Sequence, residues 1–301
     1  MSTSLLTPVY RIANNELRSV RSMSQKNVKN AGKSLKNRKK SKPADENTQN
    51  IISVLKTPEQ EHILNNETAF SIREAYNVLR TNLIFSIPKE CSKIIGVTSA
   101  ERAEGKSINI LNLAICIAET NARVLLIDCD MRIPKIYRLL DLSASPGIAN
   151  VIVGLETVDK TIKATRFANL HVLVSGNVQP NPTELLGSER FGNLVHRLSE
   201  MYDFILIDTP PVNLVADASI ISKHLAGYVF VVHQGLSERD SVVYALQQLK
   251  FVNAKILGFL LNGVTYSGSR YKYKYKKYGG YEYKSKTAEP APAVSAADED
   301  E

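Results

Sequence analysis

Cysteine is scarce in this 301-residue chain, and long apolar runs are absent. The three cysteines, Cys91, Cys116 and Cys129, form no Cys-x-x-Cys pair, which argues against a disulfide scaffold or a zinc module and favours a reducing compartment. No apolar run approaches the ~20 residues of a membrane-spanning helix. The first residues also lack the apolar segment of a secretory signal. We therefore expect a cytoplasmic protein, with enough hydrophobic residues (44%) for a packed core.

Net charge is nearly absent from the middle of the chain. The whole chain carries +8, yet residues 51–265 hold 20 Lys and Arg against 21 Asp and Glu. Residues 1–50 hold 11 against 3, residues 266–287 hold 7 against 1, and residues 288–301 hold none against 5. This distribution argues against a nucleic-acid-binding core and favours tails that touch anionic surfaces or partners.

The changes in composition divide the chain into four parts. We expect a disordered basic leader over 1–50, a globular domain over 51–265, a tyrosine-rich tail over 266–287 and a disordered acidic end over 288–301. The leader is either simply solvated or in contact with anionic lipid headgroups or an acidic partner. Nucleic acid is a weaker alternative, because no aromatic residues alternate with the charges of the leader.

Strand and helix patterns alternate within the globular domain. Apolar residues recur every three or four positions over 70–87, which predicts an amphipathic helix, and further helices are expected over 107–120 and 238–252. The apolar runs expected to form strands are 93–97, 123–128, 170–174, 204–208, 228–233 and 256–261. This alternation predicts an α/β domain with a mostly parallel sheet and helices on both faces.

The strongest local motif is Ala-Glu-Arg-Ala-Glu-Gly-Lys-Ser over residues 100–107, which matches the [AG]-x-x-x-x-G-K-[ST] pattern of a phosphate-binding loop between a strand and a helix. In such a loop, backbone N–H groups and the helix N-terminus surround phosphates. Lys106 neutralises phosphate oxygens, and the Ser107 hydroxyl binds Mg²⁺. The motif contains a single glycine, so we expect Ala103 to occupy a position that suits glycine better. The expected nucleotide-binding residues of the loop are Ala103, Glu104, Gly105, Lys106, Ser107 and Ile108.

Acidic residues follow two apolar strands. Asp128 and Asp130 end the run VLLIDCD, and Asp208 ends the run FILID, as in a Walker B motif. Ligands of open parallel sheets bind at the carboxyl ends of the strands. Three acids there, facing a Lys/Ser loop, predict a metal–nucleotide site in a P-loop NTPase fold.

Together these residues resemble the bacterial tyrosine kinases of capsular and exopolysaccharide biosynthesis, which are near the MinD/ParA ATPases in fold. The run LLIDCDMR is similar to the extra Walker A′ motif of that family. Two further segments are similar to the kinases: EAYNVLRTNLIF over 74–85, and Gly-x-x-x-Pro-Asn-Pro-x-Glu-Leu-Leu over 176–186. The tyrosine-rich tail is a third, and the resemblance covers about residues 70–283.

The resemblance implies a role for each matching residue. Lys106 and Ser107 would bind the phosphates of ATP and Mg²⁺, Asp208 would hold the metal, and Asp130 would help through water. Asp128 would orient or deprotonate the incoming tyrosine hydroxyl. Asn262 falls where relatives touch the adenine, and Glu74 and Arg80 would pack against a neighbouring subunit. The expected phosphoacceptors, modified in trans, are Tyr266, Tyr271, Tyr273, Tyr275, Tyr278, Tyr281 and Tyr283.

The resemblance also implies partners. Relatives of this short type are activated by a transmembrane chain-length modulator, which would recruit the kinase to the inner face of the cell membrane. Self-association into a homo-oligomer and a cognate tyrosine phosphatase are expected, and nucleic acid is not. The basic tail is expected to be attracted to an acidic crevice of a neighbouring subunit until phosphorylation inverts its charge.

Two departures from the family pattern stand out. Relatives usually carry Pro-Gly where this chain has Arg102 and Ala103, and an arginine where it has Asn77. One alternative is a MinD/ParA-like ATPase that positions a membrane partner and transfers phosphate only to water. Those ATPases place a lysine where this chain has Glu101, which disfavours that alternative. A catalytically poor scaffold in an export complex is the other alternative.

Overall fold

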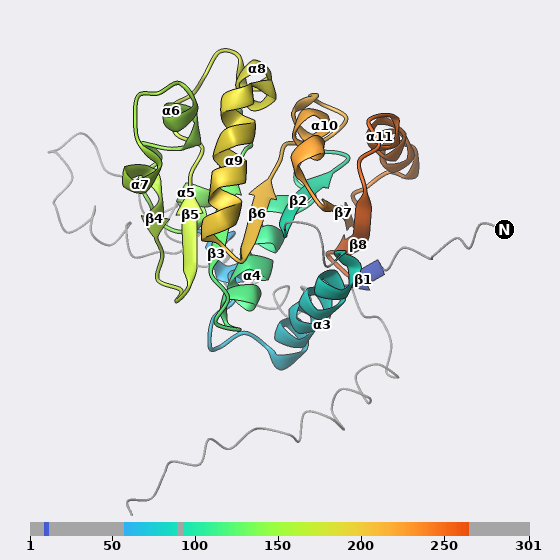
Figure 1. Ribbon diagram of the computed structural model, residues 1–301. Helices are drawn as coiled ribbons and strands as arrows, with labels where there is room; N and C mark the ends of the chain where they lie inside the picture. The colour runs from blue at the N-terminus through green and yellow to red at the C-terminus, as the bar shows by residue number, and fades with distance from the viewer. Residues whose placement is uncertain (1–8, 12–56, 89–92, 265–301) are drawn as a thin grey trace, which may run out of the picture. The chain divides into compact units, whose positions relative to one another are not determined.

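The computed structural model describes residues 9–11, 57–88 and 93–264 (Figure 1). Within these ranges, eight strands form one sheet in the order β1-β8-β7-β2-β6-β3-β5-β4. Every neighbouring pair is parallel except β4 and β5. The strands are β1 (Val9–Arg11), β2 (Ile94–Ser99), β3 (Val124–Asp128), β4 (Lys163–Ala164), β5 (Leu170–Leu173), β6 (Phe204–Asp208), β7 (Gly227–His233) and β8 (Ile256–Asn262). The predicted mostly parallel α/β sheet is confirmed.

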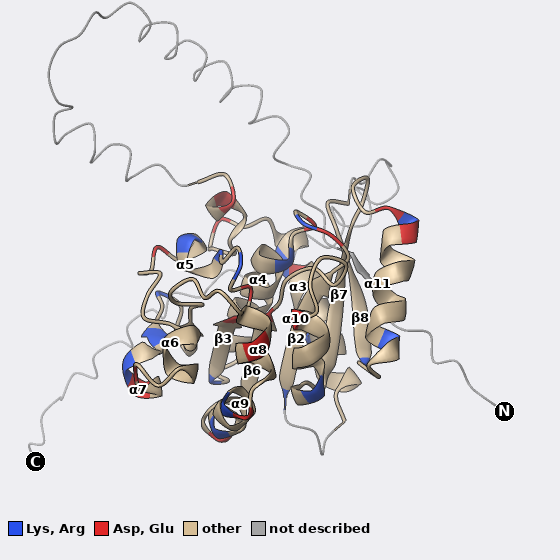
Figure 2. Ribbon diagram, turned by 90° about the horizontal axis from the view of Figure 1, so that it is seen from above, with Lys and Arg blue, Asp and Glu red and all other residues tan. Residues whose placement is uncertain are grey.

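Helices cover both faces of the sheet, as Figure 2 shows from above. The helices are α3 (Phe70–Ser86), α4 (Lys106–Ala118), α5 (Ile136–Leu139), α6 (Ile148–Ile152), α7 (Val158–Thr161), α8 (Pro182–Gly187), α9 (Glu189–Met201), α10 (Asp217–Ile221) and α11 (Arg239–Phe251), with short 3-10 turns at Gln60–His62 and Ser222–His224. None of these helices is both long and apolar enough to cross a membrane.

Alternating residues of the central strands divide the core into two layers. On β3, Val124 and Leu126 pack with α3, α4 and α5, whereas Leu125 and Ile127 pack with α6, α9 and α10. On β7, Tyr228 and Phe230 pack against α10 and α11. Successive strand side chains point to opposite faces, so a strand buried on both faces is a continuous apolar run. This is why these strands were recognisable in the sequence.

The structure differs from the sequence-based expectation at the edges of the sheet. Val9–Arg11 pair with Phe259–Leu261 of β8, so the expectation of a disordered leader fails for these three residues. An edge strand presents unpaired N–H and C=O groups, and a short strand from elsewhere in the chain satisfies them. Helices α5 to α10 and the two-residue strand β4 were not predicted. The remainder of the leader, the tyrosine-rich tail and the acidic end lie outside the described residues.

Candidate nucleotide-binding site

The phosphate-binding loop connects the end of β2 to the start of α4, as the sequence predicts. Gly105 has φ +95°, and a Cβ there would collide with the side-chain amide of Asn262. Ala103 has φ +62°, which confirms that it occupies a glycine-like position. The left-handed conformation costs an alanine about 1 kcal/mol relative to the right-handed one. The two positive φ angles turn the loop back on itself ahead of the helix N-terminus.

Side chains behind the loop hold its backbone in place. The buried Glu104 carboxylate accepts a hydrogen bond from the Glu101 backbone N–H (2.8 Å) and a second, short one from the Ser237 hydroxyl. The Asn262 side-chain amide donates to the Glu104 carbonyl (3.0 Å). The structure therefore places Glu104 and Asn262 as supports of the loop. The adenine contact of Asn262 stays a prediction.

A cavity of about 340 Å³ opens in front of the loop. Gly105, Lys106, Ser107 and Ile108 line it, together with Asp130. The Lys106 side chain is only 7% exposed. Burial lowers the pKa of Lys106, and the nearby carboxylates of Asp208 and Asp130 oppose that effect. A lysine partly stripped of water attracts phosphate oxygens more strongly than one in bulk solvent.

The wall of this cavity is mixed in charge. Basic side chains come from Arg102, Lys106, Arg132 and Lys135, and acidic side chains from Glu59 and Asp130. The sequence led us to expect an acidic crevice that attracts a basic tail, and the wall does not match that expectation. The difference arises because Asp128 and Asp208 are buried beneath the surface of the cavity.

Asp208 lies next to Asp128, because β3 and β6 are adjacent parallel strands with the two residues in register. Both Asp208 carboxylate oxygens are buried and have no hydrogen-bond partner. Burial raises the pKa of Asp208 to about 7, against the opposing effects of Lys106 and Ser107. The Ser107 hydroxyl is near enough to lower this pKa, although it forms no hydrogen bond with Asp208. A buried carboxylate without partners is costly and fits a site for a cation.

Asp128 has the opposite environment, although its carboxylate is also fully buried. It accepts hydrogen bonds from the backbone N–H groups of Asp130, Lys135 and Ile136, each 3.1 Å long. Burial and Asp208 raise its pKa, and the backbone hydrogen bonds partly offset this. Asp130 is partly exposed on the cavity wall and accepts from the Ile133 N–H (3.0 Å). The three acids therefore lie close together, with Asp130 on the cavity wall and with Asp128 and Asp208 buried, and their roles toward a metal stay predictions.

An ion pair that the sequence analysis missed fixes the loop after β3. Arg132 lies on the cavity wall, and its Nε is 3.1 Å from Oδ2 of the fully buried Asp217 at the start of α10. The Thr183 hydroxyl donates to Asp217 Oδ1 (2.6 Å) and accepts from Arg132 (2.8 Å). Thr183 belongs to the Pro-Asn-Pro segment that was singled out in the sequence. Thr183 of that segment, in α8, therefore contributes to the site by contacting Arg132 in the loop after β3.

A second missed element is the segment 57–64, here called the strap, which forms another part of the cavity wall. Glu59 and His62 line the cavity, and Glu59 pairs with Lys135 (3.2 Å). The Gln60 side chain donates to the Arg138 carbonyl and to Asp141, both at 2.8 Å. Nothing in the local sequence pattern signalled this role, because the partners are about 80 residues away.

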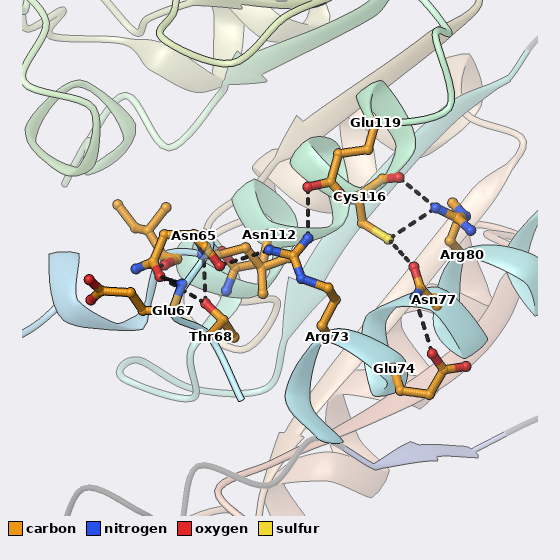
Figure 3. A network of polar contacts seen from close by, with 12 residues as sticks. Asn65, Glu67, Thr68, Arg73, Glu74, Asn77, Arg80, Asn112, Cys116 and Glu119 are labelled. Carbon is orange, nitrogen blue, oxygen red and sulfur yellow. Dashed lines mark hydrogen bonds and ion pairs between the residues drawn. The ribbon is translucent and has the colours of Figure 1, made fainter. Parts of the chain in front are cut away.

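Glu74 and Arg80, expected at a subunit contact, make contacts within their own chain (Figure 3). Arg80 Nη1 donates to the Cys116 carbonyl (2.8 Å), and Glu74 accepts from the Asn77 amide (3.2 Å). The Cys116 carbonyl is one of the last in α4, where carbonyls lack intrahelical partners, so Arg80 satisfies it. The subunit contact stays a prediction. The seven expected phosphoacceptor tyrosines lie outside the described residues.

Comparisons of sequence place the chain among known proteins. A profile described as the AAA domain matches residues 92–249. The tyrosine-protein kinase CpsD of Streptococcus agalactiae is 36% identical over 71% of this chain and 92% of CpsD. The tyrosine-protein kinase YwqD of Bacillus subtilis is 34% identical over 69% of this chain and 85% of YwqD.

Solved structures give the same result. The kinase domain of the Escherichia coli tyrosine kinase ETK has a TM-score of 0.69 and 27% identity, covering 86% of this chain and 91% of that domain. The chimerical protein CapA2B2 has a TM-score of 0.65 and 30% identity, covering 73% and 99%. MinD of Pyrococcus horikoshii, at 24% identity and a TM-score of 0.50 over 57% and 70% of the two chains, shares the fold.

Proposed function

Because this chain belongs to the family of bacterial tyrosine-protein kinases, we propose that its cavity transfers the γ-phosphoryl group of ATP to tyrosine hydroxyls, including those of its own C-terminal cluster in trans. The observation that supports this most directly is the pair of partnerless Asp208 oxygens behind the buried Lys106. A phosphate-binding loop facing an unsatisfied acid is an arrangement suited to a metal-bound nucleotide.

Each part of the site has a proposed task. The backbone of the loop and Lys106 hold the β- and γ-phosphates. Ser107 and Asp208 would hold Mg²⁺, and Asp130 would act through water. Mg²⁺ is usually bound in proteins by one or two carboxylates together with phosphate oxygens. The ion would neutralise charge on the phosphate oxygens.

Transfer forms a bond between the tyrosine oxygen and the γ-phosphorus and breaks the bond from that phosphorus to the β–γ bridging oxygen, so that ADP leaves. The tyrosine proton passes to a carboxylate, for which we assign Asp128. Its raised pKa suits a proton acceptor. Three of roughly four acceptor positions on its oxygens are occupied by backbone N–H groups, which leaves one for a tyrosine hydroxyl.

The proposal extends to regulation. A kinase of this family would act in capsular or exopolysaccharide polymerisation and export. It would be cytoplasmic and recruited to the inner face of the cell membrane by a transmembrane modulator. It would also self-associate and be reset by a tyrosine phosphatase. The likeness to CapA2B2, named as a chimera, is consistent with a partner that forms part of the functional unit.

The decisive experiment mixes two full-length variants with Mg-ATP. Lys106→Ala should incorporate no phosphotyrosine alone, since losing one such electrostatic donor lowers a rate by about 100- to 1000-fold. The variant with Phe at all seven tail tyrosines keeps its nucleotide site but lacks acceptors. Mass spectrometry of the mixture should find phosphate on the tail of Lys106→Ala, which identifies transfer in trans. Normal phosphorylation of Lys106→Ala alone would refute the kinase site. ATP hydrolysis by the unmodified protein without any phosphotyrosine would favour the MinD/ParA-like alternative.

A further inference from the structure

A buried polar relay connects helix α3 to the phosphate-binding loop. The Tyr76 hydroxyl donates to Asn109 Oδ1 (2.8 Å), and Asn109 Nδ2 donates to the Gly105 carbonyl (2.8 Å). The exposed fractions of Tyr76 and Asn109 are 3% and 2%. Burial raises the pKa of Tyr76, so its hydroxyl remains a donor at any physiological pH.

The Gly105 carbonyl is an unusual place for a side-chain hydrogen bond. It already accepts the first backbone bond of α4, from the Asn109 N–H (3.1 Å). The Asn109 amide adds a second bond, so one residue holds both the helix start and the orientation of the preceding peptide group. That peptide follows the left-handed Gly105 and leads directly to Lys106. Rotation of the Gly105 peptide would redirect the backbone N–H groups that face phosphate.

The same relay reaches the strap, which also lines the cavity. Asn112 Nδ2 donates to the Tyr76 oxygen (3.0 Å) and to the His62 carbonyl (2.9 Å). Its Oδ1 accepts from the Leu64 N–H (2.9 Å). His62 lines the nucleotide cavity. Tyr76 is therefore bonded to Asn109, which holds the phosphate-binding loop, and to Asn112, which holds the strap.

From these contacts we infer that Tyr76 and Asn109 are positioning residues of the nucleotide site: Asn109 fixes the Gly105 peptide, and Tyr76 fixes the rotamer of Asn109. The inference rests on the proposed function, because it assigns these residues to nucleotide binding. Neither residue touches the reacting atoms. Their effect is on the affinity for nucleotide, since a loop that is free to rotate must be ordered when phosphate binds.

The test compares Tyr76→Phe with Tyr228→Phe. Both tyrosines are almost fully buried, and the Tyr228 hydroxyl donates to the carbonyl of Ala218 in α10 (2.5 Å), which is not part of the phosphate-binding loop. Each variant therefore loses one buried hydroxyl, with similar loss of thermal stability expected. Tyr76→Phe should raise the Kd for a fluorescent ADP analogue with Mg²⁺ about three- to tenfold, as expected for one lost hydrogen bond. Tyr228→Phe should change it less than about twofold.

Steady-state kinetics distinguish a positioning role from a purely structural one, because only a positioning role changes the KM for ATP without changing the KM for the peptide. Tyr76→Phe should raise KM for ATP by the same factor and leave KM for a peptide copying residues 265–287 unchanged. Asn109→Ala, which removes the amide itself, should have an effect at least as large. Equal Kd values for Tyr76→Phe and Tyr228→Phe, or a parallel rise in both KM values, would overturn the inference.

The two proposals fail in different ways. A wild-type protein that binds the ADP analogue but transfers no phosphate to tyrosine would refute the kinase proposal, and the Kd comparison would still decide the positioning role. A wild-type protein that phosphorylates its tail with no Kd difference between the variants would refute only the positioning role. A wild-type protein that does not bind the analogue would refute both.

Discussion

Asp208→Asn should change the stability of the nucleotide-free protein in a pH-dependent way, with the more favourable effect at high pH. The native pKa of about 7 lies above the ordinary value of 3.8. An acid with a raised native pKa binds more protons folded than unfolded, so stability falls as pH rises from about 4 to 7 and is constant above. For Asp208 this lowers the free energy of unfolding of the wild type by at most roughly 4 kcal/mol at pH 8 and 1.5 kcal/mol at pH 5, compared with an acid whose pKa is not shifted. The amide has no pKa in this range, so the substitution removes this loss.

The amide that replaces the carboxylate is itself buried without a hydrogen-bond partner, which lowers the free energy of unfolding by about 1–3 kcal/mol at every pH. The diagnostic quantity is therefore the change with pH. Relative to wild type, the free energy of unfolding of Asp208→Asn should be greater at pH 8 than at pH 5 by about 2.5 kcal/mol. The neighbouring Asp128 adds to this difference, because Asp208 helps to raise its pKa and the substitution removes that contribution.

Urea unfolding at pH 5, 6, 7 and 8 without nucleotide measures this difference. Asp203→Asn is the matched control, because Asp203 is an exposed acid whose pKa is lowered by Arg123. Its effect on the pH dependence should be small and opposite in sign. With Mg-ADP at about 100 times its Kd, wild type should gain about 2.7 kcal/mol and Asp208→Asn much less. A difference between wild type and Asp208→Asn that does not vary with pH would refute the reasoning that Asp208 is buried without a partner.

Three further predictions concern the loop, α3 and the tail. In thermal melts, Ala103→Gly should change the free energy of unfolding by less than about 0.5 kcal/mol, because relief of the positive φ is offset by a more flexible unfolded chain. Gly105→Ala should unfold at a lower temperature in such melts and should bind nucleotide more weakly. Arg80→Ala should lower the free energy of unfolding in urea by about 1 kcal/mol, since the Cys116 carbonyl loses its partner; no change would mean that water replaces the guanidinium. The seven-Phe tail variant should bind nucleotide with wild-type affinity in calorimetry, yet remain in the assembled state after Mg-ATP when light scattering shows the wild type dissociating; equal masses would leave the tail as a linker.

The sheet and the phosphate-binding loop were predictable because their signals are local. Each buried strand is a short apolar run, and the loop motif specifies four of eight consecutive positions. The predicted strand 204–208 agrees with β6 to the residue. Helix α9 could have been found as well, since Phe191, Leu194, Val195 and Leu198 recur at helical spacing and are all buried.

The supports of the site were not predictable, because their partners are distant in sequence. Asp217 meets Arg132 across 85 positions, and Gln60 meets Asp141 across 81. The strap buries Ile63 and Leu64, but two apolar residues are too few to establish a period. Strand β1 likewise pairs with a strand some 250 residues away. In each case the role of a polar or short segment depends on contacts with residues far away in the sequence, which a local pattern does not reveal.

Asp128 shows how the sequence pattern and the structure together determine the environment of an acid. Its position at a strand end predicts a side chain in the crevice, and the structure does place it beside Asp208. The chain then turns back over it, and three backbone N–H groups enclose its carboxylate. Asp208 has no such turn and keeps both oxygens unsatisfied. Two acids with the same sequence signature thus acquire different environments, which is why we propose that Asp128 accepts the tyrosine proton and that Asp208 holds a cation.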